Sequence, residues 1–297
     1  MDKVAVLMST YNGGDYIEEQ IKSIYDQTQD GLKLYIRDDG SDPVFVNRLK
    51  MLQEKYSFVL YQGENVGFLK SFWWLLDHVK DAEYYSFADQ DDIWYPDKTQ
   101  RAVTWLDAQK KTDVPLLYHC AYLIRNEATG ASSDFYYKEE EYDFRRSITE
   151  NHYSGFAMVV NQTMRQYMLK GDVSQIDYHD WWAANIVKAF GVAYNDQTVG
   201  AIHRAHQENV TRITLKSRIR WVKRMLTQES DIKKRMKEFE HVFGDRLSEK
   251  NEKWVKRFAK ETYSFPDAVY KCFYPKRFRP VVSSELVLRM LMLIGRV

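Results

Sequence analysis

Residues 4–12 of the chain read VAVLMSTYN, and this stretch decides the fold. Residues 4–8 are an unbroken apolar run rather than an alternating one, which is typical of a strand buried on both faces of a parallel sheet. Ile17, Ile21 and Ile24 follow at the spacing of one helical face. A buried strand followed by an amphipathic helix predicts the start of a strand–helix–strand unit, in which the next strand runs parallel to the first.

The same alternation continues along the chain. Apolar runs at 32–36, 58–61 and 84–88 predict three more strands. Two further helices are predicted by apolar residues at helical spacing, which are Val46, Leu49 and Leu52 in one and Phe68, Phe72, Leu75, Leu76 and Val79 in the other. This order predicts an α/β fold whose parallel sheet carries helices on both faces. Beyond residue 100 we expect strands at 116–124 and 156–160 and a helix at 180–190.

The composition is that of a folded globular chain. Of the 297 residues, 44% are hydrophobic and 29% are charged, which excludes a disordered chain. Two cysteines, Cys120 and Cys272, are too few for a disulfide framework, so we expect a reducing cytosol. No apolar run reaches 18 residues, so no membrane-spanning helix is expected, and the first apolar stretch is too short for a signal peptide.

The charge is unevenly distributed along the chain. Residues 216–297 hold 21 Lys and Arg against 10 Asp and Glu, whereas residues 1–215 hold 22 against 32. This opposite balance predicts a domain boundary near residue 215. Apolar residues at helical spacing predict basic amphipathic helices in the second part, for example at Ile232, Met236, Phe239 and Phe243.

Polar clusters follow three of the predicted strands at the point where each strand ends. Thr10 and Tyr11 follow the first strand, Asp38 and Asp39 the second, and residues 89–92 (Asp-Gln-Asp-Asp) the fourth. In an open parallel sheet, ligands bind beyond the carboxyl ends of the strands. The topology therefore predicts that the three clusters lie on one edge of the sheet.

The acidic cluster at 89–92 is the strongest chemical signal. Three carboxylates in four residues repel one another unless a cation lies among them, and Mg²⁺ is commonly held by one or two carboxylates together with substrate phosphates. The alternative is a solvated acidic turn ahead of a helix that Asp97 caps. Haloacid-dehalogenase-type phosphatases also carry Asp-x-Asp after a strand, but theirs is the first strand of the chain, whereas three strands precede this one.

Two other groups of residues suit catalysis but also have plainer explanations. Asp180 stands among aromatic residues at a predicted helix start, where partial burial would suit a general base and the rings of Trp181 and Trp182 would stack on a sugar. The same pattern also fits an N-cap before a core-facing aromatic pair. Later, His206 suits a metal ligand and Arg204 a diphosphate contact, and both equally fit a surface loop.

Taken together, these blocks resemble the family 2 inverting glycosyltransferases, which have the GT-A fold. The resemblance is collinear from about residue 3 to about residue 210 and is carried by residues 4–12, 27–28, 38–41, 65–67 and 89–98. The sequence Asp-Gln-Asp-Asp-Ile-Trp at 89–94, with His-Asp-Trp-Trp at 179–182, is most similar to the bacterial rhamnosyltransferase branch, which makes cell-wall rhamnans and capsules.

The resemblance implies a role for each matching residue on the donor side. Thr10 and Tyr11 would line the nucleotide base pocket, Asp39 would bond the base with Asp38 beside it, and Asp89 would contact the ribose. From residues alone, an Asp-Gly turn into a helix explains the pair at 38–39 equally well.

The remaining implied roles concern the metal and the acceptor. Asp91 would bind Mg²⁺ or Mn²⁺ bridging the diphosphate, and His206 with Arg204 would close over the metal and the diphosphate. Asp180 matches the catalytic base of the family. The acceptor side would comprise Ser154, Gly155, Trp181 and Trp182.

The resemblance implies a metal-dependent GT-A catalytic domain at 1–215. It would move a sugar from a UDP- or dTDP-sugar, dTDP-L-rhamnose in the first place, to a hydroxyl of a growing cell-surface glycan. The alternative activity is glucosyl or galactosyl transfer onto a bacterial surface glycoprotein glycan. A catalytically inactive sugar-nucleotide-binding module is the alternative without an enzyme. The acceptor is left open and could be a glycan, a lipid-linked acceptor or a glycoprotein. The base of the donor, uracil or thymine, is also left open, because both bases present the same N3–H.

Residues 216–297 match nothing in the family, and their composition alone suggests their task. The positive balance predicts docking on an anionic membrane surface. The large aromatic residues predict instead a homo-oligomer, in which packing against another subunit would bury Phe239, Phe243, Trp254 and Phe258. The two are compatible, and regular helical periods argue against nucleic-acid binding. We therefore expect a cytoplasmic protein, peripheral at the inner face of the plasma membrane.

Overall fold

The computed structural model describes residues 2–110, 113–135, 142–205, 227 and 230–297. The chain forms two compact units. The first comprises Met1–Glu139, Tyr153–Leu169 and Phe190–Gln207, and the second comprises Glu140–His152, Lys170–Ala189 and Glu208–Val297. The second unit therefore includes two segments from within residues 1–215, so a single boundary near residue 215 does not divide the chain into these two units.

The first unit is built on a mixed sheet. In the described part of the chain the sheet has nine strands, and its path runs β3 (Val59–Gln62), β2 (Leu32–Asp38), β1 (Asp2–Thr10), β4 (Ala82–Ala88), β8 (Met158–Asn161), β6 (Leu116–Asn126), β9 (Val192–Ala205) and β5 (Ile93–Trp94), with β7 (Ser132–Phe135) paired to β6. The strands β1 to β4 are parallel, as predicted. The strand β8 runs antiparallel to both β4 and β6.

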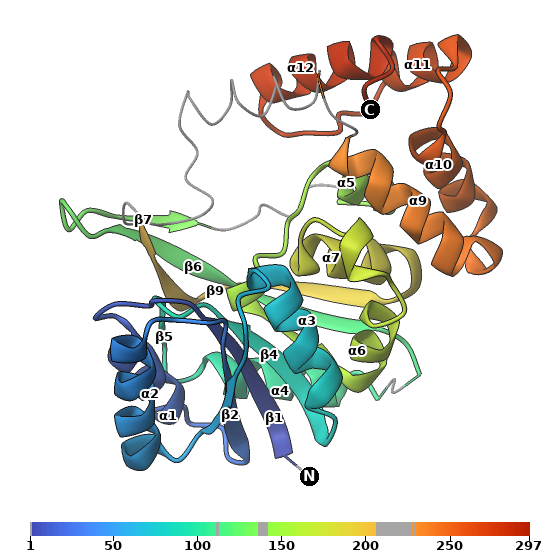
Figure 1. The fold of residues 1–297 in the computed structure, drawn as a ribbon. Coiled ribbons are helices and arrows are strands. Elements are labelled where there is room, and N and C mark those ends of the chain that lie inside the picture. The colour runs from blue at the N-terminus through green and yellow to red at the C-terminus, as the bar shows by residue number, and fades with distance from the viewer. Residues whose placement is uncertain (1, 111–112, 136–141, 206–226, 228–229) are drawn as a thin grey trace. The chain divides into compact units, whose positions relative to one another are not determined.

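Helices cover both faces of this sheet, as the strand–helix alternation predicts. The helices α1 (Ile17–Tyr25) and α2 (Pro43–Tyr56) pack on one face, and α3 (Phe68–His78) and α6 (Gln162–Met168) pack on the other (Figure 1). The strands β2 and β3 extend the sheet to one side of β1, whereas β4 lies on the other side of β1. Because crossovers between parallel strands are right-handed, this reversal of direction places α3 on the opposite face of the sheet from α1 and α2. The helix α4 (Lys98–Ala108) contributes to the core shared with α1 and α2.

The unbroken apolar run in β1 is explained by the burial of this strand on both faces of the sheet. The side chains of residues 4–8 are fully buried. Val4, Val6 and Met8 belong to the core under α1 and α2, and the alternate residues Ala5 and Leu7 face the other side, since successive side chains of a strand point to opposite faces. At about 1.5–3 kcal/mol for each large apolar side chain, burial on both faces holds β1 at the centre of the sheet.

The second unit is helical. Its described elements are α5 (Phe144–Thr149), η2 (Val173–Gln175), α7 (His179–Phe190, whose last residue belongs to the first unit), α9 (Asp231–Phe243), η3 (Gly244–Arg246), α10 (Glu249–Ala259), α11 (Phe265–Cys272) and α12 (Val282–Leu293). A helical C-terminal region is therefore present, as predicted. Among the described residues, no helix combines the length and the apolar character needed to cross a bilayer.

The aromatic residues of the second unit form its own core. Phe239 and Phe243 pack against Trp182, with ring centroids 5.3 and 5.9 Å from the Trp182 ring. Trp254 packs against Phe258 at 6.3 Å. The expectation that another subunit buries Phe239, Phe243, Trp254 and Phe258 is therefore wrong, because all four are buried by residues of the same unit.

A buried arginine joins three helices of this unit. The guanidinium of Arg235 on α9 is fully buried and pairs with Asp177. It also donates to Asn185 Oδ1 on α7 at 3.0 Å and to the backbone oxygen of Ile148 on α5 at 2.9 Å. Removing one partner of such a buried group leaves the other without compensation, so this network holds α5, α7 and α9 together.

Candidate functional site

The loops that follow β1, β2 and β4 are tied to one another by hydrogen bonds. The Tyr11 backbone N–H donates to Gln90 Oε1 at 2.9 Å, which joins the β1 loop to the acidic cluster. The Asn12 N–H donates to Ser41 Oγ at 2.9 Å, and Asn12 Oδ1 accepts from the Asp42 N–H at 3.0 Å. The three polar clusters thus share one edge of the sheet, which confirms the prediction from topology.

Asp38 and Thr10 form the buried frame of this edge. Asp38 Oδ2 accepts the Ser41 N–H at 3.0 Å, and Asp38 Oδ1 accepts the Ser41 hydroxyl and, at 3.4 Å, the Thr10 hydroxyl. Both Asp38 and Thr10 are buried, whereas the Tyr11 side chain is 51% exposed. Of these predicted base-pocket residues, Tyr11 presents the most surface to a ligand.

Asp39 has a structural role in addition to its predicted contact with the base. Asp39 Oδ1 pairs with the Arg37 guanidinium and accepts the Val66 N–H at 3.0 Å, and Oδ2 accepts the Gly67 N–H at 2.8 Å. Gly67 is the N-cap residue of α3. The buried carboxylate therefore fixes the entry to α3 against the end of β2, and a role toward the base stays a prediction.

Gly40, next to Asp39, is required by this close packing. Its φ of +80° lies in the region that favours glycine, and a Cβ there would stand 2.7 Å from the Asn65 backbone nitrogen. The Asp-Gly-Ser turn at 39–41 and the Asn-Val-Gly turn at 65–67 are thus packed against each other.

The acidic cluster is completed by a histidine from a distant strand. Asp89, Asp92 and His203 offer ligand atoms that all lie within 4.8 Å of one another. The antiparallel pairing of Ile93 on β5 with Ile202 on β9 brings Asp92 beside His203, and the His203 Nδ1 to Asp92 Oδ1 distance is 2.8 Å. His203 is not among the metal ligands predicted from the sequence, because only the register between β5 and β9 places it beside Asp92.

The electrostatics of this cluster follow from burial. Asp92 is fully buried, which raises the pKa of its carboxyl, partly offset by the hydrogen bond with His203. Burial opposes the charged form of His203, but the bond to Asp92 and the charges of Asp89 and Asp91 outweigh it and raise the His203 pKa to about 9. Asp92 Oδ2 is buried and has no hydrogen-bond partner among the described residues.

A buried lysine lies close to the same cluster. Lys98 at the start of α4 is fully buried, and its Nζ lies 3.1 Å from the centroid of the Trp94 ring. Among the residues that the structure describes, no side chain or backbone group accepts a hydrogen bond from this Nζ. Burial lowers the Lys98 pKa to about 7.

The donor set of two carboxylates and one imidazole fits a divalent cation. Carboxylate oxygens are the ligands that Mg²⁺ and Mn²⁺ prefer, and imidazole is a common additional ligand. The unpartnered, buried Oδ2 of Asp92 is consistent with a positive group at this place. Asp91, the predicted metal ligand, lies partly exposed in the same segment, and its negative charge acts on His203.

The His203 ring also links the cluster to the predicted acceptor loop. It stacks on Phe156, with centroids 4.9 Å apart and planes 11° apart, and meets the edge of Tyr122 at 6.3 Å. The Tyr122 hydroxyl is 3.0 Å from Ser154 Oγ. Ser154 precedes Gly155, the first residue of η1 (Gly155–Ala157), so this loop is packed around the same aromatic pair.

The predicted residues from the end of β9 are placed differently. The Arg204 guanidinium is buried, pairs with Glu19 and lies 4.6 Å from the Tyr16 ring centroid. Its predicted contact with a diphosphate stays a prediction. His206 lies outside the described residues.

Asp180 belongs to the second unit, in the first turn of α7. It is partly exposed, and its Oδ1 accepts the Trp181 N–H at 2.7 Å. Trp181 is also partly exposed, and its Nε1 donates to the Ser147 backbone oxygen at 2.6 Å. Trp182 is fully buried, which corrects its expected place on the acceptor side, because a side chain without exposed surface cannot stack on a sugar.

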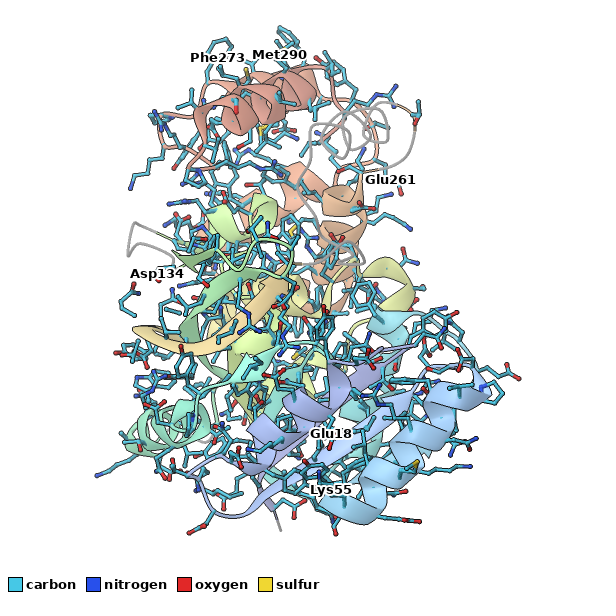
Figure 2. All side chains as sticks on the ribbon, turned by 90° about the vertical axis from the view of Figure 1, so that its left-hand side faces the viewer. Glu18, Lys55, Asp134, Glu261, Phe273 and Met290 are labelled. Carbon is cyan, nitrogen blue, oxygen red and sulfur yellow. The ribbon has the colours of Figure 1, made fainter. Side chains whose placement is uncertain are left out.

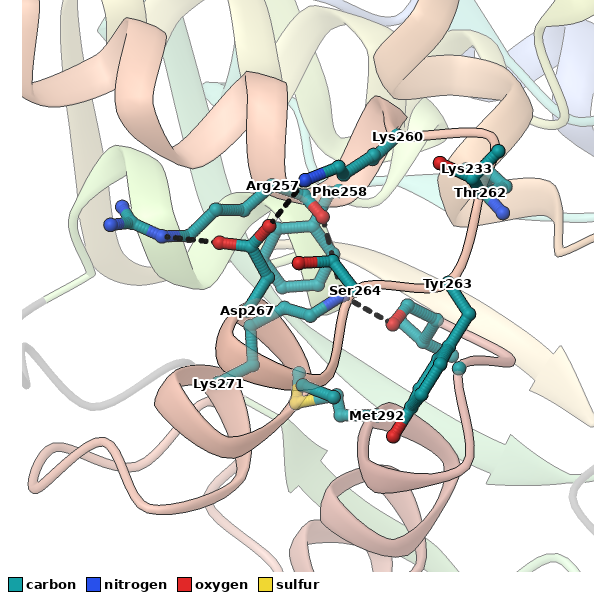
Figure 3. Close-up of a pocket in the computed structure, with 13 residues that line it drawn as sticks. Lys233, Arg257, Phe258, Lys260, Thr262, Tyr263, Ser264, Asp267, Lys271 and Met292 are labelled. Carbon is teal, nitrogen blue, oxygen red and sulfur yellow. Dashed lines mark hydrogen bonds and ion pairs between the residues drawn. The ribbon is translucent and has the colours of Figure 1, made fainter.

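A pocket elsewhere in the second unit is too small for a nucleotide-sugar. Figure 3 shows it beside the Lys271 side chain, which donates to the backbone oxygens of Arg257 and Val297. Its cavity of about 20 Å³ has room for one water molecule, whereas ligand pockets measure about 300–1,000 Å³. Burial lowers the Lys271 pKa to about 8.

Comparison with known proteins finds glycosyltransferases among the relatives of this chain. The dTDP-rhamnosyl transferase RfbG of Shigella flexneri is 26% identical over 227 residues, which cover 68% of this chain and 72% of that protein. An uncharacterized glycosyltransferase of Nostoc sp. is 30% identical over 133 residues, which cover 43% of this chain and 39% of that protein.

Two solved structures show the same fold. TarS residues 1–349 of S. aureus superposes with a TM-score of 0.60 at 14% identity and covers 99% of this chain and 81% of that one. The mannosyltransferase PcManGT of Pyrobaculum calidifontis, solved with GDP-Man and Mn²⁺, has a TM-score of 0.54 at 14% identity and covers 99% and 86%. These likenesses confirm the predicted GT-A fold.

The family model described as glycosyl transferase family 2 matches residues 5–170. This range contains β1 to β4, the three polar clusters and the acidic segment at 89–92. Because the match covers more than half of the chain, the chain belongs to glycosyl transferase family 2.

Proposed function

We propose that this chain is a metal-dependent inverting glycosyltransferase that moves L-rhamnose from dTDP-L-rhamnose to a hydroxyl of a growing cell-surface glycan. The observation that carries the proposal is the group of Asp89, Asp92 and His203 at the edge where the loops after β1, β2 and β4 meet. The match to a Shigella flexneri dTDP-rhamnosyl transferase supports the choice of sugar. Glucosyl or galactosyl transfer from a UDP-sugar is the second candidate.

Binding of the donor is assigned to residues of the first unit. Tyr11 contacts the base with its exposed ring, Asp39 bonds the base, and Asp89 bonds the ribose. Asp91 and His206 would hold Mg²⁺ or Mn²⁺, and Arg204 would contact the diphosphate. When bound, the cation neutralises the charge that develops on the departing nucleoside diphosphate.

Catalysis is assigned to Asp180 of the second unit. Its carboxylate removes the proton of the acceptor hydroxyl as the oxygen attacks the anomeric carbon from the face opposite the diphosphate. One displacement inverts the configuration and needs no covalent intermediate. Trp181, which is partly exposed and whose indole N–H donates to the Ser147 backbone oxygen, positions the acceptor sugar, and Ser154 and Gly155 line the acceptor side.

A donor panel tests this proposal. Purified full-length protein is incubated with dTDP-L-rhamnose, UDP-glucose or UDP-galactose, and release of the nucleoside diphosphate is measured with Mn²⁺ or with EDTA. We expect turnover of dTDP-L-rhamnose that EDTA abolishes. Consumption of a UDP-hexose with inert dTDP-L-rhamnose would replace the sugar, and turnover unaffected by EDTA would remove the metal.

We also propose that the second unit docks peripherally on an anionic membrane surface, where a lipid-linked acceptor would be presented. Large apolar side chains are exposed on α12 and directly after α11, among them Met290 (68% exposed) on α12 and Phe273 (72%), which follows α11, both labelled at one end of this unit in Figure 2. Lys276, Arg277 and Arg296 are exposed nearby in the sequence. Apolar insertion together with basic charge is the usual combination for interfacial binding, at about 1 kcal/mol for each basic residue near the surface.

Liposome sedimentation tests the membrane contact. We expect the protein to sediment with anionic vesicles at low salt and the Phe273→Ser/Met290→Ser variant to stay in solution. The control is Val44→Ser/Met51→Ser, which changes equally exposed apolar residues on α2 of the first unit. If both variants sediment like the wild type, α11 and α12 are not the docking surface. Light scattering on the same samples measures whether the protein forms homo-oligomers.

A further inference from the structure

The strand β5 is short and lies at the end of the sheet. It comprises two residues, and its partner in the sheet is β9. Directly after β5, the Tyr95 N–H donates to the Gly200 oxygen at 3.0 Å and continues this pairing. The outer edge of an end strand leaves backbone groups without a strand partner. At that edge the Trp94 N–H donates to Ser23 Oγ on α1 at 3.0 Å, so α1 covers what β9 leaves open.

The Gln-Thr pair at 27–28, just after the end of α1, extends this cover. The Gln27 amide donates from Nε2 to the Tyr95 oxygen at 2.8 Å. The Thr28 N–H and hydroxyl donate to the Pro96 oxygen at 2.8 and 3.2 Å. The pair is one of the blocks that carry the family resemblance, and none of the roles assigned above uses it. These hydrogen bonds reach the turn that follows the acidic cluster.

The first turn of α4 is also capped by Gln27. Asp97 is the N-cap residue of α4, but its side chain forms no capping hydrogen bond and pairs with Arg101 at 3.0 Å. Gln27 Oε1 accepts the Thr99 N–H at 3.1 Å and the Thr99 hydroxyl at 2.9 Å. The first N–H groups of a helix have no acceptor within the helix, so this oxygen supplies the cap from a residue 72 positions earlier in the chain.

We propose that Gln27 is a positioning residue for donor binding, because its amide fixes the acidic segment 89–92 from behind. This inference rests on the glycosyl transfer proposed above. One amide grips both ends of the turn at 95–99, through Nε2 at its start and Oε1 at its end. The Gln90 contact with Tyr11 holds the same segment from the side of β1. Carboxylates that are already in place do not have to be ordered by the arriving donor, which favours binding.

Two substitutions separate this positioning role from the capping of α4. Gln27→Glu keeps an oxygen that can accept from Thr99, and a negative charge at a helix N-terminus is favourable, but it has no N–H for Tyr95. Gln27→Met loses both contacts. The control Gln100→Glu makes the same chemical change at an exposed position of α4. We expect the midpoint of thermal unfolding to fall by about 2–4 °C in Gln27→Met and by less in Gln27→Glu.

Two measurements on the full chain test the position of the segment and its consequence. Hydrogen exchange of the metal-free protein, followed by mass spectrometry, should be faster at residues 89–99 in both Gln27 variants, because the outer edge of β5 is released. Titration calorimetry with dTDP in the presence of Mn²⁺ should show binding weakened by about tenfold in both, which corresponds to one or two lost hydrogen bonds. Gln100→Glu should match the wild type in both measurements.

Steady-state kinetics distinguish positioning from a general loss of stability. The carboxylates are unchanged in the Gln27 variants, so saturating donor and Mn²⁺ should restore the segment. We therefore expect KM for the donor to rise by about tenfold while kcat stays within about threefold of the wild type. A variant that only contains less folded protein would show a lower kcat at an unchanged KM, which would contradict the positioning role.

The outcomes separate this inference from the proposed function. A folded Gln27→Glu that exchanges and binds dTDP as the wild type does would overturn the inference, and so would faster exchange at 89–99 without weaker binding. A wild type that binds neither dTDP nor UDP in the presence of Mn²⁺ would overturn the proposed function instead. The exchange at 89–99 would then decide whether Gln27 holds this segment.

Discussion

Replacing Lys98 with methionine is expected to stabilise the protein at neutral pH. Lys98 is fully buried, its ammonium has no hydrogen-bond acceptor among the described residues, and burial lowers its pKa from 10.5 to about 7. Methionine has a similar shape and carries no charge to desolvate. The change therefore removes a cost that the folded protein bears whenever this lysine is protonated.

The magnitude follows from the pKa difference. A difference of about 3.5 pH units at 1.36 kcal/mol per unit corresponds to about 5 kcal/mol against folding at and below pH 7. Loss of the contact with the Trp94 ring, 3.1 Å from Nζ, would subtract up to about 2 kcal/mol. The expected net gain for Lys98→Met is about 3 kcal/mol at pH 7.

The sign of the pH dependence provides a second measurement. Between pH 7 and pH 10.5 the unfolded chain keeps the Lys98 proton that the folded chain has released, so the stability of the wild type rises with pH through this window. Lys98→Met should lack that contribution. Urea unfolding at pH 7 and pH 10, followed by fluorescence and circular dichroism, measures both effects, with Lys50→Met on the exposed side of α2 as the control.

The reasoning would be refuted by a variant that is less stable than the wild type at pH 7. That result would mean that Lys98 is held by compensating charge, with Asp92 as a carboxylate that acts on it. If the stability of the wild type and that of Lys98→Met change by the same amount from pH 7 to pH 10, the lowered pKa of Lys98 is refuted.

Three further outcomes are expected. Asp91→Asn should abolish donor turnover while circular dichroism shows an intact fold, and near wild-type turnover with EDTA present would exclude the metal role. Asp180→Asn should lower kcat by about 10²–10⁴-fold in steady-state kinetics, whereas calorimetry should show that donor affinity is retained. Normal turnover together with lost donor binding would exclude Asp180 as the catalytic base. Trp182→Ala should destabilise the protein by about 3–5 kcal/mol in urea unfolding, because it empties a fully buried site beside Phe239, and an unchanged midpoint would contradict that packing.

The order of strands and helices in the first unit was readable from the sequence because its signals are local. An unbroken apolar run marks a strand buried on both faces, and a 3.6-residue period marks a helix that covers it. Once the order is known, the parallel direction of the strands places the carboxyl ends of β1, β2 and β4 on one edge. Thr10, Asp38 and Asp89 could therefore be grouped without coordinates.

Contacts between distant segments could not be read in this way. His203 meets Asp92 across 111 residues because β9 pairs with β5 in one register, and a shift by one residue would turn the imidazole to the other face of the sheet. The burial of Trp182 by Phe239 and Phe243 likewise depends on α9 packing against α7.

The sequence by itself thus determined the family, the fold class and the edge on which the polar residues gather, since each depends on local pattern and on the order of elements. Only the tertiary structure decided which histidine joins the acidic cluster, which tryptophan of the pair is buried and which segments complete the helical unit. The physical reason is that strand register and helix packing are set by the burial of the whole chain, which no single stretch of residues encodes.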